Sequence, residues 1–98
     1  MLTHIVVWKY REGVTAAERE DHVARLRRLP SFISHVESFI VGADELRLAR
    51  SYDTGLVATF RDRAGLEAYD AHPEHVLVAA FGRSISAHVA SVDFESEG

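Results

Sequence analysis

The stretch YDAHPEHV, residues 69–76, gathers the side chains of this chain that are best suited to acid–base chemistry. A histidine such as His75, with an ordinary pKa near 6.5, can take a proton from a carbon beside a carbonyl group. A tyrosine such as Tyr69 can donate a hydrogen bond to the oxygen that becomes negative as the enolate forms. These two residues are therefore the first candidates for a catalytic pair.

The spacing of Tyr69 and His75 decides whether they can act together. Six residues on an unbroken helix turn through about 600°, so the two side chains would lie about 120° apart and would not meet. Pro73 favours a break, because proline is poorly tolerated inside a helix but suits the first turn of a new one. A turn between two short helices can bring both side chains over one cavity. The alternative is a helix-capping histidine and a core tyrosine whose hydroxyl bonds to a backbone carbonyl.

The same stretch contains an H-x-x-H pattern, His72 and His75, and two histidines at this spacing can share a metal ion. No third ligand is evident, and a capping position for His72 directs its side chain away from that of His75. Glu74 is expected to be solvated at a helix N-terminus, where its charge is favourable. We expect no metal site and no cofactor, since the chain also lacks a phosphate-binding or dinucleotide-binding glycine motif.

Two further histidines lie on other predicted elements. His4 shares a strand face with Trp8 and is, in isolation, most often a hydrogen-bonded core residue. In a catalytic interpretation, His4 would instead position the substrate or one of the catalytic pair. His22 lies one turn before Leu26 on the first predicted helix. It either faces the same cavity or stays solvated at the edge of the apolar stripe.

Length and composition describe one ordinary globular domain over residues 1–98, with 47% hydrophobic and 27% charged residues. The net charge of -4 disfavours a general nucleic-acid binder. The chain has no cysteine, which excludes disulfides and thiolate metal sites. The apolar start lacks the features of a signal peptide, and no segment approaches the roughly 20 apolar residues of a membrane span. We therefore expect a cytoplasmic protein without a membrane partner.

Hydrophobic alternation and periodicity predict four strands and three helices. The predicted strands cover residues 2–10, 35–41, 54–60 and 86–94. The predicted helices cover residues 16–29, a short segment capped by Asp62, and residues 73–82. Thr15 and Glu18 form a capping-box pattern, Pro30 is expected to end the first helix, and the last four residues are expected to fray. This order predicts an α+β fold, a ferredoxin-like β-α-β-β-α-α-β sandwich with helices on one side of a four-stranded antiparallel sheet.

The predicted sheet has a second face, which the helices do not cover. Its residues are largely apolar: Ile5, Val7, Val57, Thr59, His88, Ala90, Val92 and Phe94. Such a patch is larger than a monomer normally exposes. We expect two copies to pack sheet face against sheet face as a two-fold homodimer.

The chain resembles the stress-responsive A/B barrel domain family, also called dimeric α+β barrel or Dabb proteins. The resemblance spans almost the whole chain and rests on four features: the opening THIVVWKY, the EGVT turn, a glycine that closes the second strand, and the run LVATFRDRAGLEAYDAHPEHV. It implies that the paired sheets of a homodimer form a barrel. Some members resemble stress-associated or antifungal plant proteins, and others are polyketide cyclases without a cofactor.

In those cyclases, a histidine and a tyrosine of the matching helical run do the chemistry beside a histidine of the first strand. The resemblance therefore implies that His75 is the base, Tyr69 the acid and His4 their neighbour. We further expect a substrate pocket lined by Val6, Trp8, His22, Leu26, Leu56, Val78 and Ala79. The cyclase pocket is more aromatic than this lining, a departure that concerns the substrate more than the chemistry. The magnesium site of some plant members is not carried over, because the segment LPSFISHV differs.

Three functional hypotheses follow. The leading one is cofactor-free acid–base chemistry on a small carbonyl compound, such as aldol-type cyclisation of a poly-β-keto chain or a related isomerisation. The alternative is a small-molecule-binding or stress-protective homodimer without turnover. A monooxygenase of the same barrel type is a third, weaker hypothesis. A cavity that touches His75 and Tyr69 would favour an enzyme or a binder, whereas a filled core would favour the protective role.

Overall fold

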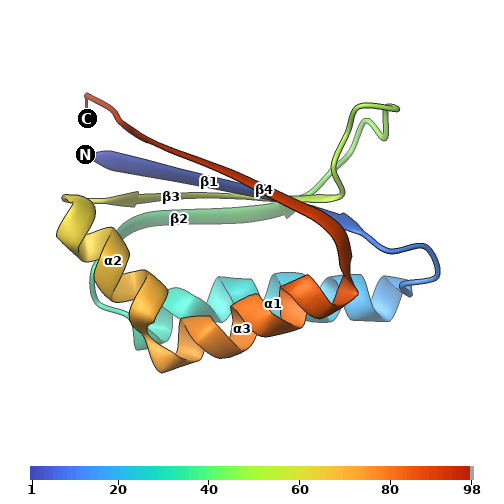
Figure 1. The fold of residues 1–98 in the computed structure, drawn as a ribbon, viewed down its shortest axis with the longest axis horizontal. Helices are drawn as coiled ribbons and strands as arrows, with labels where there is room; N and C mark the ends of the chain where they lie inside the picture. The colour runs from blue at the N-terminus through green and yellow to red at the C-terminus, as the bar shows by residue number, and fades with distance from the viewer. Residues whose placement is uncertain (98) are drawn as a thin grey trace.

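Three helices cover one side of a four-stranded antiparallel sheet in the computed structural model, which describes residues 1–97 (Figure 1). The elements are β1 (Leu2–Tyr10), α1 (Ala16–Phe32), β2 (Val36–Ala43), β3 (Thr54–Phe60), α2 (Arg63–Ala71), α3 (Pro73–Ile85) and β4 (Ser86–Glu95). The strands are arranged in the order β2-β3-β1-β4. The predicted ferredoxin-like fold is thus confirmed.

Local signals account for the starts of the helices. The side chain of Thr15 accepts the N–H of Glu18, and the side chain of Glu18 accepts the N–H of Thr15, so the predicted capping box is present. Asp62 caps α2 by accepting the N–H of Gly65 at 2.9 Å. His72 stands between α2 and α3 and caps α3.

Two helices end later in the structure than the sequence predicted. Pro30 lies inside α1, which continues to Phe32. Leu29 and Ile33 are both buried, so packing of the last turn against the core outweighs the hydrogen bond that Pro30 cannot donate. For the same reason α3 reaches the buried Ile85 instead of ending at Gly82.

The second strand and the C-terminal segment also extend further than expected. β2 runs through Gly42 to Ala43, because both residues pair with β3. Glu95 belongs to β4, and Ser96 donates its backbone N–H to the Met1 carbonyl oxygen at 2.7 Å, so these residues do not fray. Gly98, the last residue of the expected frayed end, lies outside the described residues.

Strand register assigns each side chain to one of two sheet faces. Ile5 lies opposite Val57 on β3 and Val92 on β4, on the face without helices. Exposed fractions of 53% for Val92 and 70% for Ile40 show that this outer face is open. His4 lies opposite Ala58 and Asp93, on the face that packs against the helices, where the core residues gather.

No helix formed by residues 1–97 combines the length and the hydropathy that crossing a membrane requires.

Candidate functional site

A cavity of about 300 Å³ lies between the sheet and the helices α2 and α3, at the joint that carries the histidine-rich stretch. Its volume is at the lower end of the range of about 300–1,000 Å³ that is usual for small-molecule sites. The lining residues are His4, Val6, Trp8, Leu26, Leu56, Tyr69, Asp70, His75, Ala79, Arg83, Val89, Ser91 and Asp93. All three residues expected to do chemistry, and five of the seven expected in the pocket wall, therefore line one cavity.

The break between α2 and α3 brings Tyr69 and His75 together, with ring centroids 4.4 Å apart. Nδ1 of His75 lies 3.0 Å from the backbone carbonyl oxygen of Asp70. Because a carbonyl can only accept, Nδ1 carries the hydrogen and donates it. In the neutral ring, the lone pair is then on Nε2. Nε2 lies 3.8 Å from Oδ1 of Asp70, beyond hydrogen-bond distance, and is therefore available as a base.

Burial sets the protonation states of this pair. Burial lowers the pKa of His75, while the hydrogen bond to the Asp70 carbonyl and the Asp70 charge partly oppose that shift. The charges of His4 and Arg83 lower the same pKa further. Burial, with a smaller contribution from the Asp70 charge, raises the pKa of Tyr69 well above its usual range. At neutral pH, His75 is therefore a neutral base and Tyr69 a protonated donor.

Tyr69 is only 1% exposed and packs among aromatic rings. The rings of Phe60, Phe39 and His4 lie within 5.2–6.2 Å of its ring, centroid to centroid. Within residues 1–97, its hydroxyl makes no hydrogen bond, so it has no backbone carbonyl partner of the kind expected for a purely structural tyrosine. The hydroxyl is thus free to bond to a molecule in the cavity.

His4 is oriented by a carboxylate that sequence reasoning did not single out. Nδ1 of His4 donates to the side chain of Asp93, which lies opposite it on β4. This contact fixes the ring orientation and leaves Nε2 of His4 free of Asp93. The sequence did contain a signal for Asp93: once His88, Ala90 and Val92 are assigned to the outer face, Asp93 must point to the helix side.

Two residues expected in the pocket wall do not line the cavity. His22 is fully buried, so it is not the solvated residue of the alternative interpretation either. Its Nδ1 lies 2.7 Å from the Tyr10 hydroxyl, and its ring packs edge-on against Trp8 with centroids 5.0 Å apart. His22 is one turn nearer than Leu26 to the start of α1, and this places it against the other end of β1.

Val78 faces away from the cavity because of its angle on α3. Around the axis of α3, the side chain of Ala79 lies about 40° from that of His75, and the side chain of Arg83 lies about 80° from it in the same direction. The side chain of Val78 lies about 60° from that of His75 in the opposite direction. Val78 accordingly lines a groove beside α1. The same helical angles could have indicated Arg83, which is exposed and forms no ion pair within residues 1–97.

Metal ligands are not gathered at this site. Among residues 1–97, no group of three or more histidine, aspartate or glutamate side chains is arranged to hold a metal ion. His72 uses Nδ1 to accept the N–H of Glu74 at 3.1 Å, which is the capping role expected for it.

Comparison with known proteins places this geometry in a family. The family model described as the stress responsive A/B barrel domain (Dabb) matches residues 2–96. A dimeric ferredoxin-like protein from Thermobifida fusca YX is 29% identical with a TM-score of 0.87, over 95% of this chain and 88% of that chain. A second dimeric ferredoxin-like protein, from Bacteroides fragilis NCTC 9343, is 25% identical with a TM-score of 0.85, over 97% of this chain and 95% of that chain.

An enzyme also has this fold. The hydroxynitrile lyase from Passiflora edulis is 14% identical with a TM-score of 0.85, over 95% of this chain and 90% of that chain. At this identity, the likeness concerns the fold alone. No curated protein sequence matches the chain significantly.

Proposed function

We propose a function from the premise that this chain belongs to the stress responsive A/B barrel domain (Dabb) family. The protein binds a small carbonyl compound in the cavity and moves a proton on it without a cofactor. One observation carries the proposal: His75, with Nε2 available as a base, packs against Tyr69, whose hydroxyl has no partner within residues 1–97. Base and hydrogen-bond donor thus face the same cavity.

The chemistry begins with a C–H bond beside a carbonyl group. Nε2 of His75 takes the proton, and the electron pair of the C–H bond moves onto the carbonyl oxygen. The Tyr69 hydroxyl donates a hydrogen bond to this enolate oxygen, and its raised pKa keeps it protonated. His4, oriented by Asp93, is a positioning residue for substrate or for Tyr69.

Two outcomes are open to the enolate. Its carbon can attack a second carbonyl of the same molecule, which forms a C–C bond and breaks the C=O π bond. The alkoxide formed then takes the proton held by His75 and gives an aldol product, as in cyclisation of a poly-β-keto chain. An enolate that is conjugated with a C=C bond can instead take the proton back from His75 on the far carbon of that bond, which moves the C=C bond and gives an isomer. The apolar wall formed by Val6, Trp8 and Leu56 suits the hydrocarbon part of either substrate. The hydroxynitrile lyase from Passiflora edulis is an example of a lyase with this fold.

Deuterium exchange into pentane-2,4-dione, followed by NMR, tests the proposal because it requires only proton abstraction. We expect wild-type protein to accelerate exchange above the buffer rate and His75→Ala to abolish this acceleration. His35→Ala is the matched control, since His35 is exposed and lies outside the cavity. Acceleration that persists in a folded His75→Ala variant would contradict the proposal.

A ligand-binding or stress-protective homodimer without turnover is the second candidate. The observation that favours it is the largely apolar cavity wall, since unpaired polar groups among apolar residues recognise ligands as well as they catalyse. Binding of the dione without any acceleration of exchange would support this candidate over the enzyme.

We further propose that two copies pair through the outer sheet face. The apolar residues Ile40, Val57, Val92 and Phe94 are exposed, and the strand register places them on the sheet face opposite the helices. Burying such a patch against a second copy is favourable, and two-fold pairing is the commonest arrangement of homo-oligomers. The relatives from Thermobifida fusca and Bacteroides fragilis are themselves described as dimeric.

A further inference from the structure

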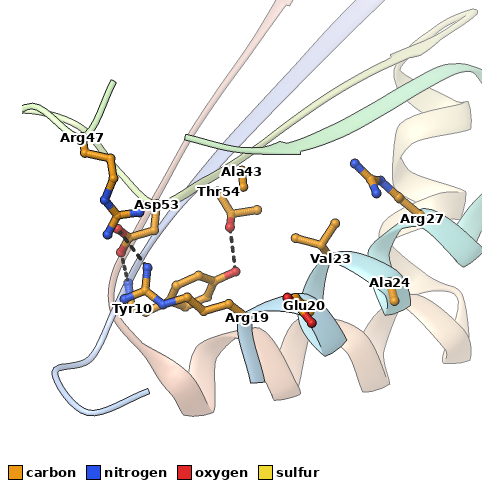
Figure 2. Close-up of a pocket in the computed structure, with 10 residues that line it drawn as sticks. All are labelled: Tyr10, Arg19, Glu20, Val23, Ala24, Arg27, Ala43, Arg47, Asp53 and Thr54. Atoms are coloured by element: carbon orange, nitrogen blue, oxygen red, sulfur yellow. Dashed lines mark hydrogen bonds and ion pairs between the residues drawn. The ribbon is translucent and has the colours of Figure 1, made fainter. Parts of the chain in front are cut away.

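A second cavity, of about 330 Å³, lies between the first half of α1 and the β2–β3 end of the sheet (Figure 2). It shares no lining residue with the cavity of His75. Val23 and Ala24 of α1 and Ala43 of β2 form its apolar wall. A half-open pocket of this volume, with an apolar wall beside charged groups and away from the His75 cavity, is a candidate site for a separate ligand.

Three guanidinium groups and two carboxylates line this second cavity. Arg19 pairs with Asp53 at 3.5 Å and stands over the Tyr10 ring, and Asp53 also accepts the Tyr10 backbone N–H at 2.8 Å. Glu20 lies at the exposed rim. The lining therefore has an excess of one positive charge in a chain whose net charge is -4.

The remaining two arginines differ in what they bind. Arg27 donates both Nε and Nη2 to the carbonyl oxygen of Val41, at 3.2 and 2.7 Å, and so satisfies a carbonyl of the edge strand β2. The Arg47 side chain forms no ion pair or hydrogen bond within residues 1–97. Arg47 is therefore the guanidinium with all of its N–H groups available to a ligand.

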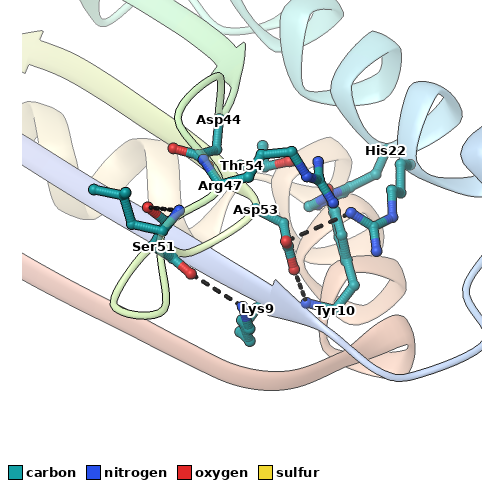
Figure 3. A network of polar contacts seen from close by, with 10 residues as sticks. Lys9, Tyr10, His22, Asp44, Arg47, Ser51, Asp53 and Thr54 are labelled. Atoms are coloured by element: carbon teal, nitrogen blue, oxygen red, sulfur yellow. Dashed lines mark hydrogen bonds and ion pairs between the residues drawn. The ribbon is translucent and has the colours of Figure 1, made fainter.

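The loop that carries Arg47 is held in an unusual backbone conformation. Arg47 has φ of 52°, in the left-handed region where glycine or asparagine fits with less strain. Its N–H donates to the side chain of Asp44 at 2.7 Å, and Lys9 Nζ donates to the Ser51 carbonyl oxygen at 3.0 Å (Figure 3). These two hydrogen bonds hold the loop in place, and Arg47 lies at one end of the cavity (Figure 2).

The floor of the cavity contains the hydroxyl groups of Tyr10 and Thr54, which are bonded to each other. The Tyr10 hydroxyl already bonds to Thr54 Oγ1 at 2.8 Å and to His22 Nδ1 at 2.7 Å. Burial raises the pKa of Tyr10, so this hydroxyl stays neutral. Recognition of a charged ligand must therefore come from the arginine side of the cavity.

We propose that this cavity is a second binding site, for a small amphipathic carboxylate. The carboxylate pairs with the guanidinium of Arg47, whose planar fork matches its two oxygens. The hydrocarbon part lies against Val23, Ala24 and Ala43 and leaves water. This site is independent of the acid–base chemistry proposed for the His75 cavity.

Calorimetric titration with octanoate tests the site, with octan-1-ol as the uncharged probe of similar length. We expect saturable binding of one octanoate per chain and at least tenfold weaker binding of octan-1-ol. Arg47→Gly should weaken octanoate binding at least tenfold. This variant should fold, since glycine relieves the left-handed backbone strain. Arg50→Gly, in the same loop but outside the cavity lining, is the matched control and should bind like wild type.

Two further variants locate the ligand. Ala24→Leu keeps every charge but places a larger apolar side chain inside the cavity, from a helix position that tolerates leucine, so it should weaken octanoate binding at least tenfold. His75→Ala should leave octanoate binding unchanged. The proposal is overturned if wild type shows no saturable binding at millimolar octanoate, or if Arg47→Gly binds as tightly as Arg50→Gly. It is equally overturned if His75→Ala, and not Ala24→Leu, removes binding.

Discussion

The rings of Tyr69 and His75 lie with centroids 4.4 Å apart, although the two residues belong to different helices. α2 ends at Ala71, and Pro73 begins α3 with His72 as the cap between them. On one unbroken helix the two side chains would point about 120° apart. The helix break is therefore what places a neutral imidazole against a protonated phenol.

Tyr69→Phe separates catalysis from packing at this pair. The substitution removes only the hydroxyl, which has no partner within residues 1–97, and keeps the ring in its aromatic surroundings. We expect the accelerated dione exchange to fall roughly 100-fold, as for loss of one oxyanion donor. The free energy of unfolding should change by less than about 1 kcal/mol. A large loss of stability in urea denaturation would instead assign the hydroxyl a structural bond.

The pH dependence of exchange reports the protonation of His75. Burial lowers its pKa below 6.5, and only the neutral ring is a base. The rate should therefore rise with pH through a midpoint below 6.5 and reach a plateau at neutral pH. Arg83→Gln removes a charge that lowers this pKa, so it should move the midpoint to higher pH. A midpoint that does not respond to Arg83→Gln would argue that another group controls the rate.

Gly82→Ala tests the packing of α3 against α1 and β1. A Cβ at this position would lie 2.7 Å from Nε2 of the buried His22 and 3.1 Å from Nε1 of Trp8. We expect the free energy of unfolding to fall by about 1–3 kcal/mol, despite the better helix propensity of alanine. The loss measured by urea denaturation should be smaller in a His22→Ala background, where the closest contact is gone. Equal losses in both backgrounds would show that His22 is not the obstacle.

His22 should make the stability of the protein depend on pH. Burial, with help from the Arg25 charge and against that of Asp21, lowers the pKa of His22 to about 4. The unfolded chain takes up this proton near pH 6.5, so the unfolded state binds more protons than the folded state between pH 6.5 and 4. The free energy of unfolding should therefore fall by roughly 2 kcal/mol from pH 7 to pH 5 on account of His22.

Urea denaturation at pH 7 and pH 5 measures this effect, with His22→Gln as the comparison. The glutamine variant should show a smaller fall, and what remains includes His75, whose pKa is shifted in the same direction. The same fall in both proteins would contradict the assignment to His22.

Val92→Asp tests the proposed pairing through the outer sheet face. A carboxylate there would have to be buried without a partner in the dimer, which is strongly unfavourable. We expect analytical ultracentrifugation to show a dimer for wild type and a monomer for Val92→Asp. Val76→Asp is the control, since Val76 on α3 is 50% exposed, close to the 53% of Val92, but lies away from the sheet. Dissociation by Val76→Asp alone would place the interface on the helices.

Residues close together in the sequence determined where helices begin and which face of the sheet each strand residue occupies. Capping by Thr15 and Asp62, the break at Pro73, and the alternation of β4 each depend on residues near one another in the chain, so they could be predicted without a structure. The assignment of Ile5 and Val92 to one face followed from the two-residue period of a strand.

Tertiary packing decided what each side chain meets. His22 lies against Tyr10, not in the His75 cavity, because the contact point of α1 along the sheet depends on how the whole helix packs. The burial of Leu29 and Ile33 lets α1 pass Pro30. Asp93 and His4 are 89 positions apart in the sequence. They are in contact because the pairing register of β1 and β4 places them opposite each other. Such contacts are set by the collective fit of strands and helices, on which local propensity has no bearing.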